Sequence, residues 1–314
     1  MPVKWIVVGV GDIARKRVIP AIFAEPESEL YGLVTRDARK AKAYPGARAW
    51  GVVDDALRDG AFDAVYIAAP VALHAGYALS ALRAGKHVLC EKPMAINHAE
   101  AQAMTEAAAE SGRLLGVAYY RRLYPKLLRL RELLQDGAIG QPVLAEANCH
   151  GSLPRPDRAW LLDPAMAGGG PLYDTACHRI DAFNFLFGAP VRVAALLSNA
   201  VHHLPVEDSA TVLIDYANGT RGVVDVRWNS RVDRDHFRVT GTEGEIDLSP
   251  LNGPQLRIRT PGGERFEELP PHANLHYPVV SNFVRAISGR AALTCTAADA
   301  AQTDWVIERA SRSR

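Results

Sequence analysis

The stretch that decides the fold is VVGVGDIARKRVIPAI, residues 7–22, where an apolar run passes through glycines into a helical pattern. It holds the spacing G-x-G-x-x-A, with Gly9, Gly11 and Ala14 at the fixed positions. Gly9 permits a tight turn, Gly11 lets the backbone approach a pyrophosphate, and Ala14 is small enough for close helix–strand packing. A helix that begins here offers free N–H groups and positive dipole charge to phosphates. We therefore predict a dinucleotide site formed by Gly9, Gly11, Asp12, Ile13 and Ala14, the alternative being a plain strand–helix turn.

The first 118 residues continue this alternation of strands and helices. Apolar, strand-like runs occupy residues 4–10, 30–35, 64–69, 86–90 and 114–118. Between them, residues 73–84 and 98–111 have helical spacing, and Asn97 with Glu100 forms a capping box before the second of these helices. Strands that alternate with helices predict a parallel sheet, here a Rossmann sheet, and nearly continuous apolar strands indicate that helices cover both faces.

The pattern changes after residue 120. We expect a helix at 123–135, a strand within 140–151, a proline-rich loop at 152–164 and a buried helix within GGGPLYDTACHRIDAFNFLFG, residues 168–188. Alternating strands separated by ANGT, GTEGE and PGGE turns then fill residues 191–269, which predicts an open, largely antiparallel sheet. Helices follow at about 277–288 and 297–312. The fold class is α/β, with a Rossmann domain over 1–120 and an α/β domain over 121–314.

Composition excludes several classes of protein. A net charge of +1 over 314 residues supplies no basic field for nucleic acid or a membrane surface. The four cysteines are far apart in the sequence, which fits a reducing compartment, and no apolar run approaches the length of a membrane span. We expect a soluble, cytoplasmic protein. We expect no metal, because His202, His203, His272 and His276 have no Cys or acidic partner at ligand spacing.

The end of the second strand bears on the choice of cofactor. An NAD site usually has Asp or Glu at this position to hold the ribose 2′-hydroxyl, but here the strand ends in Thr35 and Arg36, with Asp37 one residue further. Thr35 can hydrogen-bond a 2′-phosphate, and Arg36 can pair with it or stack on the adenine. This favours NADP(H), with NAD(H) possible. The alternative is that Arg36 is a surface arginine.

Two charged residues, Glu91 and Lys92, directly follow the apolar run at residues 86–90, in HVLCEKPMA, residues 87–95. In an open α/β sheet, ligands bind beyond the carboxyl ends of the strands, so Glu91 and Lys92 are expected beside a ligand. Taken alone, the pair also fits a solvated strand end. Further along, Asp174 and His178 lie four residues apart on one helical face, and His suits proton exchange with an alcohol. That pair alone also fits a structural contact.

With GVGDIA, AAPVALHAGYALSALRAGKHVLCEKPMA and GGGPLYDTACHRID in this order, nearly the whole chain resembles the glucose–fructose oxidoreductase / inositol dehydrogenase (Gfo/Idh/MocA) family. The resemblance implies NAD(P)-dependent oxidoreduction of sugars, polyols and related cyclic alcohols. It implies a sheet in the second domain that forms a homodimer or homotetramer. It also implies that Lys92 meets Asp174 and His178 across the domain cleft, where the three bind substrate and Lys92 hydrogen-bonds the reacting oxygen.

The resemblance assigns further residues around the cofactor. Ala69, Pro70 and His74 correspond to a turn that often reads Thr-Pro-Asn before the His, so this chain lacks one amide contact there. Glu91 is assigned to structure or cofactor positioning, and Pro93, often cis in the family, would fix Lys92. Tyr120 replaces a frequent Asn before Arg121, and both are expected to line the cofactor or substrate site. Trp160, with Arg158, is expected to border it or to pack within its loop.

Two rival functions remain. A dihydrodiol-type dehydrogenase acting on a more apolar cyclic diol would suit Tyr119, Tyr120 and Trp160. A non-catalytic NADP-binding regulatory protein would use the same fold. A pure binder has no need to keep Lys92, Asp174 and His178, so their presence favours an enzyme that transfers hydride between nicotinamide and a secondary alcohol or ketone.

Overall fold

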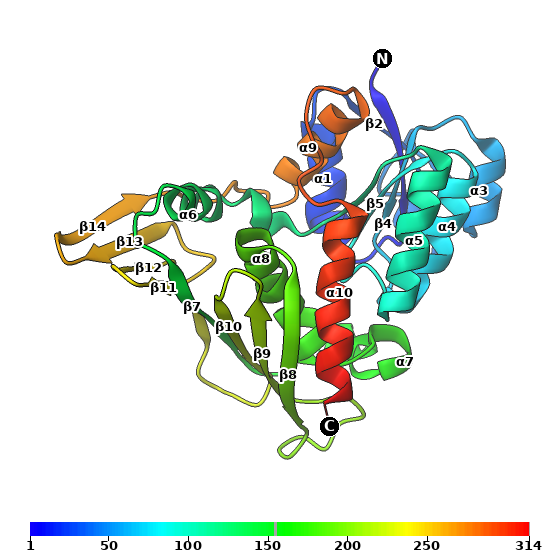
Figure 1. Cartoon of the computed structure of the whole chain (residues 1–314). Coiled ribbons are helices and arrows are strands. Elements are labelled where there is room, and N and C mark those ends of the chain that lie inside the picture. Colours follow the sequence, from blue (N-terminus) through cyan, green and yellow to red (C-terminus); the bar gives the residue numbers. More distant parts are fainter. Residues whose placement is uncertain (154–155, 314) are drawn as a thin grey trace. The chain divides into compact units, whose positions relative to one another are not determined.

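The structure is a computed structural model that describes residues 1–153 and 156–313. The chain forms two compact units, coloured along the sequence in Figure 1. The first comprises Met1–Tyr120 and His272–Ala301, and the second comprises Arg121–Pro271 and Gln302–Arg314. No helix in the described part of the chain has both the length and the apolar character needed to cross a membrane.

The first unit is built on six strands in the order β3-β2-β1-β4-β5-β6, and every adjacent pair is parallel. Their bounds are Val3–Val8 (β1), Ser28–Val34 (β2), Arg48–Trp50 (β3), Ala64–Ile67 (β4), His87–Cys90 (β5) and Leu115–Val117 (β6). The Rossmann sheet is confirmed. The sequence pattern missed β3 because this strand has three residues and is largely exposed, so it has no apolar run.

Helices cover both faces of this sheet, as Figure 1 shows: α3, α4 and α5 lie on one side, and α1 and α9 lie on the other. The bounds are Ala14–Val18 (η1), Ile19–Ala24 (α1), Ala38–Ala41 (α2), Val53–Asp59 (α3), Val71–Leu73 (η2), His74–Arg83 (α4), His98–Ser111 (α5) and Tyr277–Ile287 (α9). The cap before α5 is confirmed, because the Asn97 side chain accepts a hydrogen bond of 2.9 Å from the Glu100 N–H.

The segment His272–Ala301 departs from the sequence-based boundary, which assigned everything beyond residue 120 to the second domain. The apolar face of α9 is the reason. It buries Val280 and Phe283, and the ring of Phe283 lies 5.5 Å from that of Trp5 in β1. The last helix, α10 (Ala297–Arg312), begins in the first unit and ends in the second.

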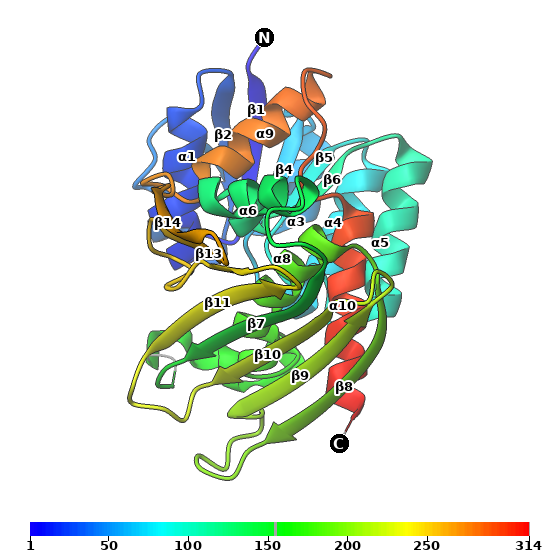
Figure 2. The ribbon, with the colours of Figure 1, turned by 60° about the vertical axis from the view of Figure 1, so that its left-hand side comes forward.

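The second unit holds an eight-stranded sheet, seen across its strands in Figure 2, in the order β14-β13-β12-β11-β7-β10-β9-β8. The bounds are Pro142–His150 (β7), Pro190–Ser198 (β8), Ser209–Tyr216 (β9), Arg221–Arg227 (β10), Arg234–Gly241 (β11), Glu245–Asp247 (β12), Gln255–Thr260 (β13) and Gly263–Glu268 (β14). Only β10 and β7 pair in parallel among these neighbours, so the expected largely antiparallel sheet is confirmed.

The helical segments of residues 120–187 are Tyr120–Leu123 (η3), Pro125–Gln135 (α6), Pro156–Leu162 (η4), Pro164–Ala167 (α7), Leu172–Ala176 (η5) and Cys177–Phe187 (α8). Of these, η5 and α8 pack on β10 of the sheet. The buried helix expected in GGGPLYDTACHRIDAFNFLFG is α8 with η5 before it. Phe183 of α8 is fully buried against Phe187 and Phe237, and Gly222 in β10 leaves room for its ring. In the loop expected at 152–164, residues 154–155 lie outside the described part of the chain, and η4 follows them.

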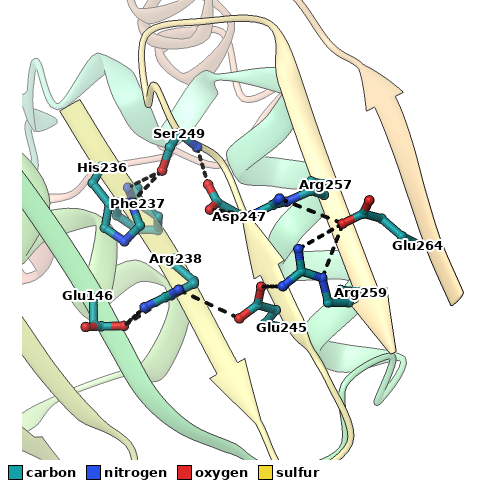
Figure 3. Close-up of polar contacts among 10 residues, drawn as sticks. All are labelled: Glu146, His236, Phe237, Arg238, Glu245, Asp247, Ser249, Arg257, Arg259 and Glu264. Atoms are coloured by element: carbon teal, nitrogen blue, oxygen red, sulfur yellow. Dashed lines mark hydrogen bonds and ion pairs between the residues drawn. The ribbon is translucent and has the colours of Figure 1, made fainter. Parts of the chain in front are cut away.

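The other face of the sheet is charged. Figure 3 shows a ladder in which Arg238 pairs with Glu146 at 2.6 Å and Arg259 pairs with Glu245 at 3.0 Å and Glu264 at 3.1 Å. Toward the β8 edge the same face presents apolar side chains: Leu196 is 79% exposed and Leu213 is 44% exposed. Alternation along each strand therefore separates a buried apolar face from an open face of mixed charge and leucine.

Candidate active site

The glycine turn has the geometry that the fingerprint requires. Gly9 has φ +90°, and a methyl group added there would lie 2.5 Å from the carbonyl oxygen of Ala68. A methyl group added at Gly11 would meet no protein atom within 4 Å, so the backbone is open on that side. Ala14 is fully buried, as close helix–strand packing requires. A tight turn with open space at the second glycine fits a dinucleotide pyrophosphate.

The side chain of Asp12 does not face this open turn as a free anion. Its carboxylate accepts hydrogen bonds from Arg15 at 2.6 Å and Lys16 at 2.7 Å. The bonds from Lys16 and Arg15 lower the pKa of Asp12. The negative charge is thus neutralised by its own helix, and the backbone N–H groups of Asp12 and Ile13 are the groups that this turn offers to a phosphate.

The tip of β2 carries a neutralised acid and an exposed arginine. The Asp37 carboxylate accepts two bonds from the Arg39 guanidinium, at 2.9 and 3.0 Å, and also accepts from the Arg39 backbone N–H as the N-cap of α2. These bonds lower the pKa of Asp37. Arg36 is exposed and has no ion pair among the described residues. Thr35 Oγ1 accepts from the Asp37 N–H at 3.2 Å, which holds the turn.

His74 joins two turns at the carboxyl end of the sheet. Its ring is 1% exposed, with Nδ1 3.0 Å from the Pro93 carbonyl oxygen and Nε2 2.9 Å from that of Ala69. Burial lowers the pKa of His74. Each nitrogen faces a backbone carbonyl oxygen, and the neutral ring donates to one of the two, so His74 links the turn after β4, where Pro70 lies, to the turn after β5. Its assignment to the cofactor site stays a prediction.

Glu91 follows β5 and is buried, with 7% of its surface exposed. Its Oε1 accepts from the Tyr66 hydroxyl at 2.8 Å and from Nε2 of His276 at 3.0 Å. Its Oε2 accepts a hydrogen bond of 3.3 Å from the backbone N–H of Lys92. Burial alone would raise the pKa of Glu91, but the bond from His276, the nearby charges and the Tyr66 hydroxyl outweigh burial and lower it. Glu91 is an ionised group inside the unit, not a solvated strand end.

Lys92 is half-buried, and the Lys92–Pro93 peptide bond is cis. Lys92 lies next to the Glu91 carboxylate at the carboxyl end of β5, where ligands of open α/β sheets bind. The first unit thus places the open glycine turn, the Thr35–Arg36 tip and Lys92 at carboxyl ends of its strands.

In the second unit, Asp174 and His178 lie on either side of a change in helix type. Residues Leu172–Ala176 form a π-helix and α8 begins at Cys177, so the continuous α-helix expected from the four-residue spacing is not what the chain forms. Such π segments recur at functional sites. His178 is buried, with 5% exposure, and the Asp174 carboxylate accepts from the Arg158 guanidinium at 3.1 Å.

Of the other predicted residues in the second unit, Arg179 and Arg121 are buried and Trp160 is exposed. Arg179 donates to the Asp235 carboxylate at 2.8 Å, which makes it a buried ion pair. Arg121 is also buried in this unit and donates to the Asn252 side chain at 3.1 Å. Trp160 is 38% exposed on η4. Among the described residues, no group of three or more His, Cys, Asp or Glu side chains is placed to hold a metal ion.

Comparison with known proteins follows the same division of the chain. Residues 3–119 match the profile of an oxidoreductase family with an NAD-binding Rossmann fold, and residues 127–247 match the GFO/IDH/MocA C-terminal domain. The chain belongs to the Gfo/Idh/MocA family of oxidoreductases. It is an enzyme of the dehydrogenase and reductase type with an NAD(P)-binding Rossmann domain.

Similar members of this family have sugar and diol substrates in their names. The chain is 30% identical to 1,5-anhydro-D-fructose reductase of Ensifer adhaerens over 308 residues, which cover 94% of this chain and 91% of the relative. It is 30% identical to trans-1,2-dihydrobenzene-1,2-diol dehydrogenase of Mus musculus, over 90% of this chain and 84% of the relative. The structure of aldose-aldose oxidoreductase from Caulobacter crescentus, crystallised with glycerol, superposes with a TM-score of 0.90 at 25% identity, covering 100% and 97% of the two chains.

Sequence reasoning missed two residues that contact Glu91 in this Gfo/Idh/MocA enzyme. Tyr66 was treated as part of an apolar strand, and nothing in that apolar run indicated a polar role for its hydroxyl. His276 was weighed only as a metal ligand. No sequence signal could have found His276. It lies far from every motif, in a segment that returns to the first unit, and local sequence patterns do not reveal such a return.

Proposed function

We propose that this enzyme is an NAD(P)-dependent oxidoreductase that prefers NADP(H) and interconverts a secondary alcohol and a ketone on a sugar, polyol or related cyclic alcohol. The observation that carries the proposal is Lys92, placed beside the buried, ionised Glu91 at the carboxyl end of β5, in the same unit as an open dinucleotide turn. The adjacent Glu91 charge favours the protonated form of the Lys92 amine, which is the form that can donate to a substrate oxygen, and a regulatory binder of NADP has no use for such a donor.

The proposed chemistry is reduction of a ketone to an alcohol, in which the ketone gains one hydride and one proton and the reduced cofactor becomes the oxidised cofactor. When bound, the nicotinamide supplies or accepts the hydride. Lys92 donates a hydrogen bond to the substrate oxygen and stabilises the negative charge that develops there. His178 supplies the proton to this oxygen, directly or through Lys92, and Asp174 orients the imidazole or a substrate hydroxyl. In the reverse direction the same groups accept the proton.

Preference for NADP(H) is supported by the charges at the end of β2. An NAD site needs an acidic side chain free to accept from the ribose 2′-hydroxyl. Asp37 is the nearest acid, and its carboxylate is already held by the Arg39 guanidinium. Arg36 is exposed beside Thr35, so a guanidinium is available to a 2′-phosphate, which it can bind in a bidentate manner. Binding of NAD(H) at lower affinity is compatible with this arrangement.

The substrate class is proposed from the relatives, since one acts on 1,5-anhydro-D-fructose and another on a dihydrodiol according to their names. A cyclic diol is the second candidate. Trp160 favours it, because its ring is 38% exposed and offers apolar surface, whereas Tyr119 is buried at 2%. We also propose a homodimer or homotetramer that assembles through the open face of the second sheet, where Leu196 and Leu213 are exposed.

A spectrophotometric screen tests the function. Purified protein is mixed with NADP+ or NAD+ and a panel of aldoses, polyols, anhydro sugars and cyclic diols, and the reverse reaction is followed with NADPH and the matching ketones. We expect hydride transfer with at least one sugar or cyclic alcohol and a higher kcat/KM for NADP(H) than for NAD(H). Tight binding of NADPH without turnover on any member of the panel would contradict the enzymatic proposal and favour the regulatory protein.

A further inference from the structure

The buried carboxylate of Glu91 receives two hydrogen bonds on one oxygen. The Tyr66 hydroxyl lies 2.8 Å from Oε1 and Nε2 of His276 lies 3.0 Å from the same atom. An ionised carboxylate only accepts, so Nε2 carries the hydrogen in this contact. His276 therefore donates to Glu91 from a segment that precedes α9, while Tyr66 donates from β4.

Contacts with Tyr120 and Asn274, in addition to the bond with Glu91, fix the position of His276. Its ring is 2% exposed and lies 5.2 Å from the ring of Tyr120, measured between centroids. Its backbone N–H donates to the Asn274 side chain at 3.1 Å, and the Asn274 amide donates to the Arg17 carbonyl at 2.8 Å. The segment is thus tied to the first helical turn of the chain, and the ring has little freedom to leave Glu91.

The ring of His276 acts on Glu91 through one nitrogen. Nδ1 of His276 is buried and has no hydrogen-bond partner among the described residues. Nε2–H is therefore the donor through which this ring acts, and its replacement by a group that cannot donate removes the contact with Glu91.

Two other titratable groups interact with the charge of Glu91. They are Tyr66 of β4 and His74 of α4. Burial and the Glu91 charge raise the pKa of Tyr66 well above its ordinary value, and burial lowers the pKa of His74, so both stay neutral near neutral pH. In addition to the bond and charge of His276, the positive charge of Lys92 lowers the pKa of Glu91.

We propose that His276 is a positioning residue for Lys92: its Nε2–H holds the Glu91 carboxylate ionised and in place, and that carboxylate keeps the neighbouring amine protonated and oriented. The role of Lys92 in turnover rests on the proposed function, but the coupling of His276, Glu91 and Lys92 does not. His276 acts through Glu91 and touches no substrate.

Labelling of Lys92 tests this coupling without any substrate. Full-length protein is labelled briefly with isotopic acetic anhydride over a series of pH values, and modification of the Lys92 peptide is measured by mass spectrometry against exposed Lys16. The chain has seven lysines, so assignment is direct. The variants are His276→Phe, which keeps a ring beside Tyr120 but cannot donate, and His276→Gln, which can donate. The control is His203→Gln, at an exposed histidine of the second unit.

We expect His276→Phe to lower the pH of half-labelling of Lys92 by about half a unit or more, because without the Nε2–H the Glu91 carboxylate is no longer held in place beside Lys92 and its countercharge weakens. His276→Gln should restore most of the wild-type midpoint, and His203→Gln should not change it. With a substrate from the screen, His276→Phe should lower kcat by about tenfold or more, shift the pH dependence of kcat and leave KM within about threefold.

A wild-type labelling midpoint in folded His276→Phe overturns the proposal. If that variant does not fold, as judged by circular dichroism, His276→Asn replaces it, because the shorter side chain cannot reach Glu91 and the same shift is expected. If wild-type protein transfers no hydride to any substrate, the proposed function fails, whereas the labelling midpoints still decide whether His276 acts on Lys92.

Discussion

Nε2 of His276 lies 3.0 Å from Oε1 of Glu91, although 185 residues separate the two along the chain. The contact places a hydrogen-bond donor from the segment His272–Ala301 next to Glu91, at the carboxyl end of β5. A buried carboxylate loses hydration and is stable in ionised form only when donors or positive charge replace the water. Tyr66, His276 and Lys92 provide these, which explains why two charges can follow a buried strand directly.

Ionisation of Glu91 should make stability depend on pH in the acid range. Its pKa is lower in the folded protein than in an unfolded chain, so its contribution is present above about 4.3, the unfolded value, and is lost as pH falls through the folded pKa. We expect the free energy of unfolding of the wild type to fall more steeply below this pH than that of Glu91→Gln. Denaturant titrations from neutral to acid pH measure this. Glu106→Gln, an exposed site on α5, serves as control, and identical slopes for wild type and Glu91→Gln would contradict the assignment.

The two glycines of the fingerprint should separate folding from cofactor binding. Gly9→Ala places a methyl group 2.5 Å from the Ala68 carbonyl at a positive φ, so we expect a loss of about 2 kcal/mol or more in unfolding free energy. Gly11→Ala meets no protein atom, so its unfolding free energy should change by less than about 1 kcal/mol. Its NADPH affinity should nevertheless fall by about tenfold or more, because the pyrophosphate must approach this position. Thermal melts and fluorescence titration measure both, and unchanged NADPH affinity in Gly11→Ala would place the phosphates elsewhere.

The regular parts of the fold could be predicted from the sequence because each has a periodic apolar pattern. The parallel strands, α5 with its Asn97 cap and the alternating strands after residue 190 all follow from such patterns. The strand β3 could not be found, since three largely exposed residues bury too little to leave a pattern. The π-type hydrogen bonding of η5 could not be predicted from the sequence either, because it covers only five residues directly before α8.

The candidate site was predictable where motifs carry it and not where distant segments meet. Gly9, Gly11 and Lys92 occur in local patterns whose spacing has a physical reason. His276 lies in no such pattern, and the return of α9 to the first unit is determined by Phe283 packing on Trp5, a contact between opposite ends of the chain. The pairing of Arg39 with Asp37 is local, but only the observed geometry shows that it occupies the acid nearest to Arg36.

Removal of the reactive amine should stop turnover without removing the cofactor. We expect Lys92→Ala to lower kcat by about a hundredfold or more, since it deletes the donor to the developing oxyanion, while NADPH affinity stays within about threefold. Steady-state kinetics and fluorescence titration measure the two effects. Lys4→Ala is the control, because Lys4 lies near the amino end of β1, away from the carboxyl ends of the strands. Wild-type turnover in Lys92→Ala would remove this residue from the mechanism.

Arg36 should distinguish the two cofactors. Arg36→Ala removes the exposed guanidinium proposed to bind the 2′-phosphate, so we expect Kd for NADPH to rise by about tenfold or more while Kd for NADH changes by less than about threefold. Calorimetric titration with both cofactors measures the ratio. Arg58→Ala, an exposed arginine of α3 that pairs with Asp55, should alter neither affinity. Equal losses for both cofactors would show that Arg36 contacts a part common to them and would contradict the assignment to the 2′-phosphate.

Assembly through the open sheet should depend on its apolar side chains. Leu196 of β8 is 79% exposed on the face that carries the charged ladder, and burial of such a side chain in an interface would contribute more than about 1 kcal/mol. We expect Leu196→Asp to shift a dimer or tetramer toward monomer in light scattering coupled to size-exclusion chromatography. The intramolecular stability of each subunit should change little, because an exposed residue is replaced. Val232→Asp, 75% exposed in the loop between β10 and β11, is the matched control and should assemble as the wild type does. A monomeric wild type, or unchanged assembly of Leu196→Asp at equal concentration, would contradict an interface on this face.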